Sequence, residues 1–179
     1  CKQCNINKKA PRRQKAALMS YHAGMPMERV HIDITGPFVE SKNGNKLILV
    51  LIDQFTKWFE CYAIPDQTAE VVCKKLVDNF ITRFGVPLYI HTDQGRNFQS
   101  SLFSELCKAL EVTRTRTTPY RPSSNGQIER YNRTLLAAVR CFIEDQRDWD
   151  EHLPLLCMAI RSTVNRSTGF TPNMLMLGR

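Results

Sequence analysis

The chain of 179 residues lacks any long apolar run. Its apolar runs reach only six residues, as in Leu47–Ile52, whereas a membrane-spanning helix needs about 20. The first residues also lack the pattern of a secretory signal, so nothing in them points to export. The composition, 42% hydrophobic, instead suits one globular domain with a substantial core and some extra chain. We therefore expect no membrane partner.

Paired cysteines are also scarce. The seven cysteines are an odd number and most stand singly, which fits a reduced intracellular protein better than a disulfide scaffold. Five of them have apolar neighbours, and we expect these to be buried as small hydrophobic side chains rather than to bind metal. They are Cys61, Cys73, Cys107, Cys141 and Cys157.

The other two cysteines, Cys1 and Cys4, form a CxxC pair. Structural zinc takes four ligands, but no second CxxC or paired histidine lies nearby, since His22 and His31 stand singly. The pair is either half of a truncated zinc-binding module or a chance pair, and we favour the first. We expect these 179 residues to hold no closed zinc site, and zinc to bind only in a longer chain.

Acidic residues are absent from residues 1–27, whose six basic residues supply +6 of the net charge of +8. We interpret this stretch as the end of the zinc-binding module followed by a basic linker that lies on a phosphate backbone; the alternative is a merely solvated tail. Residues 28–179 therefore carry only +2. Any contact of this part with nucleic acid must come from local patches of charge.

Three strands are predicted first. Alternating apolar residues predict a strand at residues 30–35, which Gly36-Pro37 ends. Asn43-Gly44 marks a hairpin turn, and the apolar run Leu47–Ile52 is typical of a buried central strand. Residues 58–63 complete an antiparallel meander, because only short turns join the three strands.

Helices and strands alternate afterwards. Apolar residues spaced by four predict a helix from residue 67 or 68 to residue 84, where Gly85 and Pro87 stop it. A strand at 88–92, a helix at 101–110 and a strand at 112–117 follow. The next helix contains Ile128, and a further helical segment begins at Trp149. This last segment would either pack on the core or form a dimer face.

Three acidic residues stand out. Asp33 lies within the first predicted strand, where Asp is depleted, although an edge position or a hydrogen-bonded structural role would explain it. Asp93 ends the fourth strand beside a glycine loop, where α/β sheets place ligands, although capping of the turn is the alternative. Glu129 is the only acid between residues 114 and 140, and its alternative role is a helix ion pair with Arg133. The arginines near it are Arg114, Arg116, Arg121, Arg130, Arg133 and Arg140.

Three motifs contain these acids: VHIDITGP at 30–37, HTDQGRNF at 91–98 and PSSNGQIER at 122–130. With the strand order, they resemble the integrase catalytic core of gypsy-type LTR retrotransposons and retroviruses, a branch of the RNase H-like fold. The 35 residues between Asp93 and Glu129 match that family's D,D(35)E signature, and the tail at 168–179 is also similar. The resemblance covers residues 1–179, but only the Cys-Cys half of the family's His-His-Cys-Cys zinc module is present.

The resemblance implies an α/β fold with a five-stranded mixed sheet, and makes residues 28–179 the catalytic core. Attack on a phosphodiester adds negative charge to a phosphate, which two divalent cations about 4 Å apart can stabilise. Mg²⁺ (or Mn²⁺) takes oxygen ligands, so carboxylates and the phosphate suffice. Asp33, Asp93 and Glu129 would be the catalytic metal ligands, with Asp33 bridging two ions per active site when DNA is bound.

The implied reaction is polynucleotidyl transfer in two steps. Water cleaves near the 3′ end of element DNA, and the new 3′-OH then attacks target DNA. The implied partners are double-stranded DNA and further copies of the chain, and the implied location is the nucleus after a cytoplasmic particle or polyprotein stage. Side chains of the active-site loop and helix would hold the DNA end and its phosphates. They are Arg121, Asn125, Gly126, Gln127, Arg130 and Arg133.

Two other functional classes remain open. Another RNase H-like nuclease would share the acids but not the loop at 122–127 or the tail. A host-recruited domain that binds DNA or protein without catalysis need not keep all three acids. Because acids, loop and tail are all present, we expect an active integrase, which a strand-transfer assay with a longer chain would test.

Overall fold

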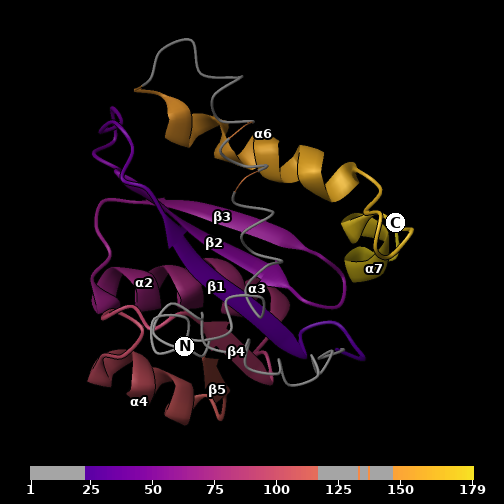
Figure 1. The fold of residues 1–179 in the computed structure, drawn as a ribbon, viewed down its shortest axis with the longest axis horizontal. Helices are drawn as coiled ribbons and strands as arrows, with labels where there is room; N and C mark the ends of the chain where they lie inside the picture. The colour runs from indigo at the N-terminus through magenta and orange to yellow at the C-terminus, as the bar shows by residue number, and fades with distance from the viewer. Residues whose placement is uncertain (1–22, 117–132, 134–136, 138–146) are drawn as a thin grey trace, which may run out of the picture.

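The computed structural model describes residues 23–116, 133, 137 and 147–179. A five-stranded sheet runs through the centre of this part, in the order β3-β2-β1-β4-β5 (Figure 1). The strands are β1 (Arg29–Thr35), β2 (Leu47–Asp53), β3 (Phe59–Ile64), β4 (Tyr89–Thr92) and β5 (Thr113–Arg116). The helical elements are α2 (Ala69–Leu76), the π-helical η1 (Val77–Ile81), α3 (Thr82–Phe84), α4 (Ser101–Ala109), α6 (Trp149–Ser162) and α7 (Pro172–Leu177).

The sheet is mixed, as the sequence predicted. β1 pairs antiparallel with β2, and β2 antiparallel with β3, so the predicted meander is confirmed. β4 joins β1 in parallel, and β5 joins β4 in parallel. β1 is therefore the central strand, which makes the edge-strand explanation of Asp33 wrong.

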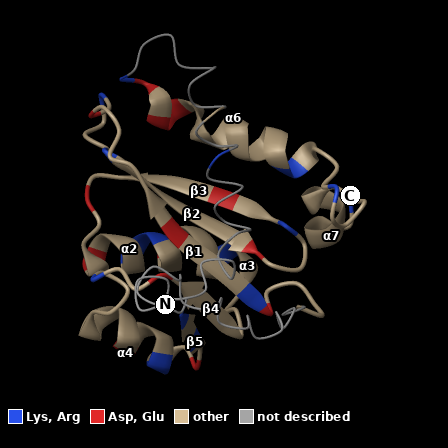
Figure 2. Cartoon of the chain, viewed as in Figure 1, with Lys and Arg blue, Asp and Glu red and all other residues tan. Residues whose placement is uncertain are grey.

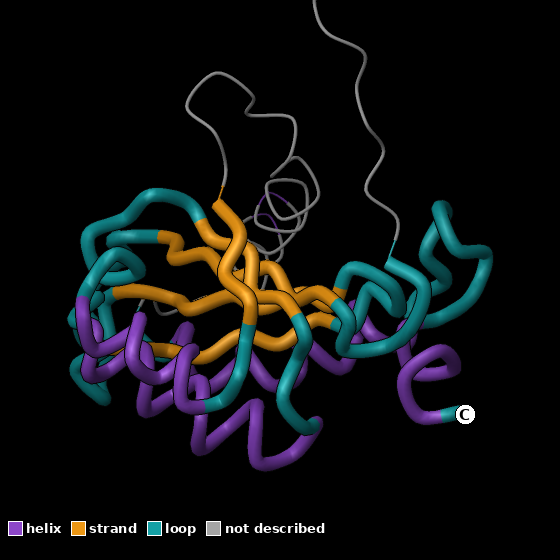
Figure 3. The backbone as a smooth tube through the Cα atoms, turned by 90° about the horizontal axis from the view of Figure 1, so that it is seen from below, coloured by secondary structure: helices purple, strands orange, loops and turns teal. Residues whose placement is uncertain are grey.

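Two apolar clusters cover the two faces of the sheet. Val30, Ile32 and Leu51 belong to the cluster that includes buried residues of α2, η1 and α4. Val50 and Ile52 belong to the cluster that includes the buried side of α6. Figure 1 shows α6 on the opposite side of the sheet from α2 and α4, and Figure 3 shows the twisted strands with helices packed along them. The sheet is thus the middle layer of the described part.

The helix predicted up to residue 84 is present, but its middle turn is π-helical. Val77–Ile81 separates α2 from α3, and Gly85 ends α3 with a φ of 88°. The Tyr62 hydroxyl donates a hydrogen bond to the Asn79 carbonyl oxygen at 3.0 Å. The π-helical turn is thereby tied to strand β3, and burial raises the pKa of Tyr62.

The hairpin between β1 and β2 is fastened to the start of α6. The Asp150 carboxylate accepts hydrogen bonds from Ser41 Oγ at 2.6 Å and from Asn45 Nδ2 at 2.7 Å. The Trp149 indole N–H donates to the Val39 carbonyl oxygen at 2.7 Å. These bonds fix α6 on the sheet from its first turn.

Helix α6 packs on the core, which was one of the two roles that the sequence left open for this segment. Trp149, Leu153 and Leu156 are buried against β2 and β3. Leu155 and Met158 lie on the other side of the helix and are exposed.

The expectation for the cysteines is confirmed wherever the structure describes them, because Cys61, Cys73, Cys107 and Cys157 are buried free thiols. Cys141 lies outside the described residues. Within the described ranges, no helix combines the length and apolar character that crossing a membrane requires.

Candidate active site

Asp33 lies near the carboxyl end of β1, two residues after the last pair that β1 forms with β4. It stands opposite Val50 of β2, and β4 runs along the other side of β1. Alternation along the strand puts Asp33 on the same face as His31, facing away from the cluster that contains Ile32. Its carboxylate oxygen Oδ1 accepts a hydrogen bond from the Ile34 backbone N–H at 2.9 Å. A polar side chain is thus held at the centre of the sheet.

Asp93 follows the last residue of β4 directly. The parallel pairing of β1 and β4 matches His31 with His91, so Asp33 and Asp93 each come two residues after one matched pair. The carboxyl ends of adjacent parallel strands meet at one edge of a sheet, where α/β proteins bind ligands. Two acids that are far apart in sequence therefore occupy corresponding places. Figure 2 shows acidic residues, in red, on the strands themselves.

The loop after Asp93 orients this carboxylate. The Gly95 backbone N–H donates to Asp93 Oδ1 at 2.9 Å. A Cβ atom at residue 95 would lie 3.0 Å from this Oδ1 and 2.6 Å from Asn97 Oδ1, so any larger residue would displace these two side-chain oxygens. Asn97 Nδ2 is buried and has no hydrogen-bond partner among the described residues. The loop thus presents a carboxylate and an unused donor side by side.

Arg114 of β5 anchors the end of this loop. Its guanidinium donates to the Phe98 carbonyl oxygen and lies 5.3 Å from the centre of the Phe103 ring. The sequence placed Arg114 only among the arginines near Glu129. Arg114 binds the Phe98 carbonyl oxygen, which only the folded chain brings close to it. The local sequence around Arg114 therefore could not predict this contact.

Two buried histidines lie one step before the acids on the same face. The His31 and His91 ring centres are 4.8 Å apart, and the side chains are 4% and 5% exposed. Burial, then the charges of His31 and Arg29, lower the pKa of His91 to about 4. This pair was not predicted from the sequence, although both motifs place a histidine two residues before the acid.

The third predicted ligand, Glu129, lies outside the described residues. So do Cys1, Cys4, Arg121, Asn125, Gly126, Gln127 and Arg130. Arg133 is described, as an exposed helical residue. Over the described ranges, no group of three metal-binding side chains occurs, and Asp33 and Asp93 are the two of the three predicted acids that belong to these ranges.

Other acids serve the fold. Asp53 is fully buried, and its carboxylate accepts hydrogen bonds from the backbone N–H groups of Met27 and Thr56. Asp66 accepts from the Thr68 hydroxyl at 2.6 Å, just before α2. Asp78 is exposed on η1. Asp53 and Asp66 are therefore structural, and Asp78 is exposed.

Comparison with known proteins identifies the family. The model of the "Integrase core domain" family matches residues 23–122. The chain is 35% identical over 180 residues to the Gag-Pol polyprotein of avian reticuloendotheliosis virus, covering 99% of this chain and 16% of that protein. It is 31% identical over 153 residues to the retrovirus-related Pol polyprotein from transposon 412 of Drosophila melanogaster, covering 85% of this chain and 12% of that protein. The chain thus spans less than a fifth of the length of these relatives.

Solved integrase structures have the same fold. The catalytic core domain of BIV integrase superposes with a TM-score of 0.69 at 26% identity, over 85% of this chain and 95% of that one. An intasome of simian T-cell lymphotropic virus in complex with PP2A regulatory subunit B56 gamma gives a TM-score of 0.82 at 24% identity, over 99% of this chain and 63% of that one. The HTLV-2 integrase catalytic core domain in complex with magnesium gives 0.69 at 20% identity, over 87% of this chain and 99% of that one. The predicted RNase H-like fold is confirmed, and the chain belongs to the integrase core domain family.

Proposed function

We propose that this chain is the catalytic core of an integrase, which cleaves near the 3′ ends of element DNA and joins those ends to target DNA. The observation that carries the proposal is the correspondence of Asp33 and Asp93 at the carboxyl ends of adjacent parallel strands. Family membership supports it, because the matched residues 23–122 include both acids.

The donor set fits Mg²⁺ or Mn²⁺. These ions take carboxylate oxygens and keep several waters, so Asp33, Asp93 and Glu129 would suffice with the DNA phosphate. Two bound ions would activate the attacking oxygen and stabilise charge on the leaving oxygen. The protein's own part is to hold the carboxylates: the Gly95 N–H orients Asp93, and the absent side chain of Gly95 leaves Asp93 Oδ1 in place.

The DNA contacts belong to the same proposal. Arg133, exposed on a helix, is available to a phosphate. Arg121 and Arg130 would add phosphate contacts, while Asn125, Gly126 and Gln127 would position the DNA end. Double-stranded DNA as partner, self-association of the core, a nuclear location and the zinc module of residues 1–27 are parts of this proposal too.

Substitution of single acids in a strand-transfer assay tests the proposal. Asp33→Asn, Asp93→Asn and Glu129→Gln each remove a charge that holds a cation, so cleavage and strand transfer should fall to background while the chain still folds. DNA affinity should persist or rise, because a negative charge near phosphate is gone.

Two variants serve as comparisons. Asp78→Asn, which removes an exposed acid on η1, should leave the rates unchanged. Arg133→Ala should weaken DNA binding and its salt dependence while the acids stay intact. Full activity in Glu129→Gln would exclude the proposed mechanism.

A further inference from the structure

A row of polar side chains crosses the sheet just before the two acids. His91 Nδ1 lies 2.9 Å from Thr115 Oγ1 of β5 on one side, and the His91 ring contacts the His31 ring on the other. His31 Nε2 lies 3.3 Å from Gln54 Oε1, which follows the end of β2. The row therefore spans from β5 to β2 through the seam between β1 and β4.

The histidine pair also marks the end of the pairing between β1 and β4. The matched residues are Arg29 with Tyr89, Val30 with Ile90, and His31 with His91, and the pairing extends no further. Asp33 and Asp93 each lie two residues beyond the histidines, about 7 Å further along the strands. The separation of the two carboxylates thus depends on how far the strands diverge past the histidines.

We propose that His31 and His91 are positioning residues, which set the separation of Asp33 and Asp93 by holding the ends of β1 and β4 at a fixed distance. The inference rests on the proposed role of the two acids as metal ligands. The histidines themselves touch no reacting atom in it, and they act through the strands that carry the acids.

The geometry explains why two histidines suit this role. The rings fill the seam, and hydrogen bonds on the outer sides keep each ring from turning. Thr115 Oγ1 also donates a long hydrogen bond to the Ile90 carbonyl oxygen at 3.4 Å, so this hydroxyl joins the His91 ring to the backbone of β4. An aliphatic side chain would fill similar space but would lose this outward tether.

The test compares His91→Leu with His91→Asn in the 179-residue chain. Asn keeps a hydrogen-bonding group near the position of Nδ1, whereas Leu keeps only volume. Mn²⁺ titration, followed by broadening of the Gly95 and Ile34 amide signals in NMR spectra, reports metal binding without any reaction. We expect His91→Leu to raise the Mn²⁺ concentration at half-effect about tenfold, the loss typical for groups that orient metal ligands. We expect His91→Asn to stay close to the wild type.

Thr115→Val is the milder variant, which decides the question if His91→Leu does not unfold cooperatively. It removes the hydroxyl that is hydrogen-bonded to His91 with little change in shape, and should also weaken Mn²⁺ binding. His152→Leu removes a partly exposed histidine of α6, far along the sequence from the two acids, and should leave Mn²⁺ binding unchanged.

The outcomes separate this inference from the proposed function. If the wild type itself shows no Mn²⁺ effect at Gly95, the proposed metal site fails. If the wild type binds Mn²⁺ and a folded His91→Leu binds it equally well, the positioning role alone is overturned. Equal binding by the wild type and Thr115→Val overturns it in the same way when His91→Leu cannot be studied.

Discussion

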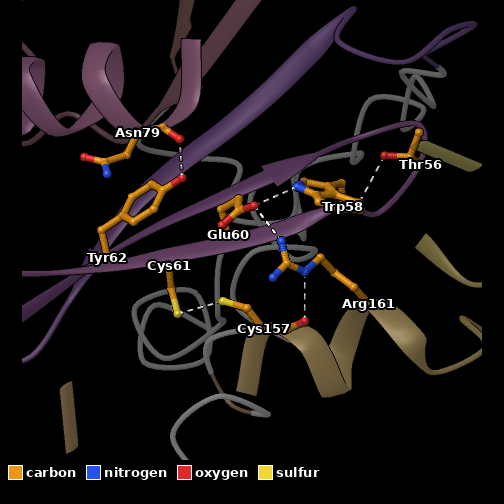
Figure 4. Close-up of polar contacts among 8 residues, drawn as sticks. All are labelled: Thr56, Trp58, Glu60, Cys61, Tyr62, Asn79, Cys157 and Arg161. Carbon is orange, nitrogen blue, oxygen red and sulfur yellow. Dashed lines mark hydrogen bonds and ion pairs between the residues drawn. The ribbon is translucent and has the colours of Figure 1, made fainter. Parts of the chain in front are cut away.

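Arg161 and Glu60 form a buried ion pair around the open edge of the sheet. Arg161 Nη1 lies 2.6 Å from Glu60 Oε1 (Figure 4). Helix α6, which carries Arg161, packs on one face of β3, whereas Glu60 and Trp58 point to the other face. The guanidinium lies 4.6 Å from the centre of the Trp58 ring, and the Trp58 indole N–H donates to the same Glu60 oxygen. Because β3 is an edge strand, the side chain of Arg161 passes around it. Helix α6 therefore packs on one face of β3 and is also bonded to Glu60 on the other face.

Arg161→Ala should therefore destabilise the fold strongly. It leaves the Glu60 carboxylate, 4% exposed, without its cation, and breaking a buried pair from one side costs about 3–5 kcal/mol. Urea unfolding at neutral pH measures the loss. The double variant Glu60→Leu with Arg161→Leu is the control and should recover much of it, since no buried charge is left. A loss below about 1 kcal/mol for Arg161→Ala would mean that the pair behaves like a surface ion pair.

The buried thiols of Cys61 and Cys157 should resist alkylation. Their sulfur atoms lie 3.2 Å apart between β3 and α6 (Figure 4). The hydrogen bond with Cys157, and then burial, raise the pKa of Cys61 well above its usual value, so little reactive thiolate forms. At pH 8.5, iodoacetamide should label Cys61 at least about tenfold more slowly than an unfolded chain. Mass spectrometry of labelled peptides, with and without urea, measures the ratio, and equal rates would contradict the burial of this pair.

The order of strands could be predicted from the sequence because its signals are local. The alternation in 30–35, the apolar run Leu47–Ile52 and the Asn43-Gly44 turn each determine a short segment, and short connections then leave few topologies. The corresponding positions of Asp33 and Asp93 follow from the same parallel pairing. The exact register, which matches His31 with His91, depends on packing between segments, and only the HxD spacing shared by the two motifs hints at it.

The sequence contains a signal for the π-helical turn in the spacing of its apolar residues. Val72, Leu76, Phe80 and Phe84 all pack on one core cluster although they are spaced strictly by four. In an α-helix, each step of four rotates a side chain by about 40°, so four such residues drift across the surface. The wider turn at η1 reduces this drift and keeps the stripe on the sheet. Strict spacing by four over three steps is therefore a hint of a π-helical turn.

The Asp53 carboxyl should make stability depend on pH in an unusual direction. Burial raises the pKa of Asp53 above its usual value, so the folded state binds this proton more tightly than the unfolded state. The contribution of Asp53 is then largest at low pH and declines as the pH rises from about 3.8 through the higher folded pKa. Asp53→Asn should remove this decline from the pH profile of urea unfolding. It should also cost about 1–3 kcal/mol at pH 7, because an amide N–H₂ faces the N–H of Met27 or Thr56. An unchanged profile would contradict the raised pKa.

Gly95→Ala should damage catalysis more than stability. The added Cβ would lie 2.6 Å from Asn97 Oδ1 and 3.0 Å from Asp93 Oδ1, so both polar groups must move. They are ends of side chains, and they can move at a stability cost within about 1 kcal/mol, because alanine also restricts the unfolded chain more than glycine does. Strand transfer should nevertheless fall about tenfold or more, since small displacements of reacting geometry are costly. Gly24→Ala is the matched control, because its Cβ would meet only Glu28 Oε2 at 3.5 Å, and it should keep full activity. Parallel measurements of strand-transfer rate and urea unfolding decide the matter: a Gly95→Ala protein that is unstable but fully active per folded molecule would show that Gly95 serves the fold and not the position of Asp93.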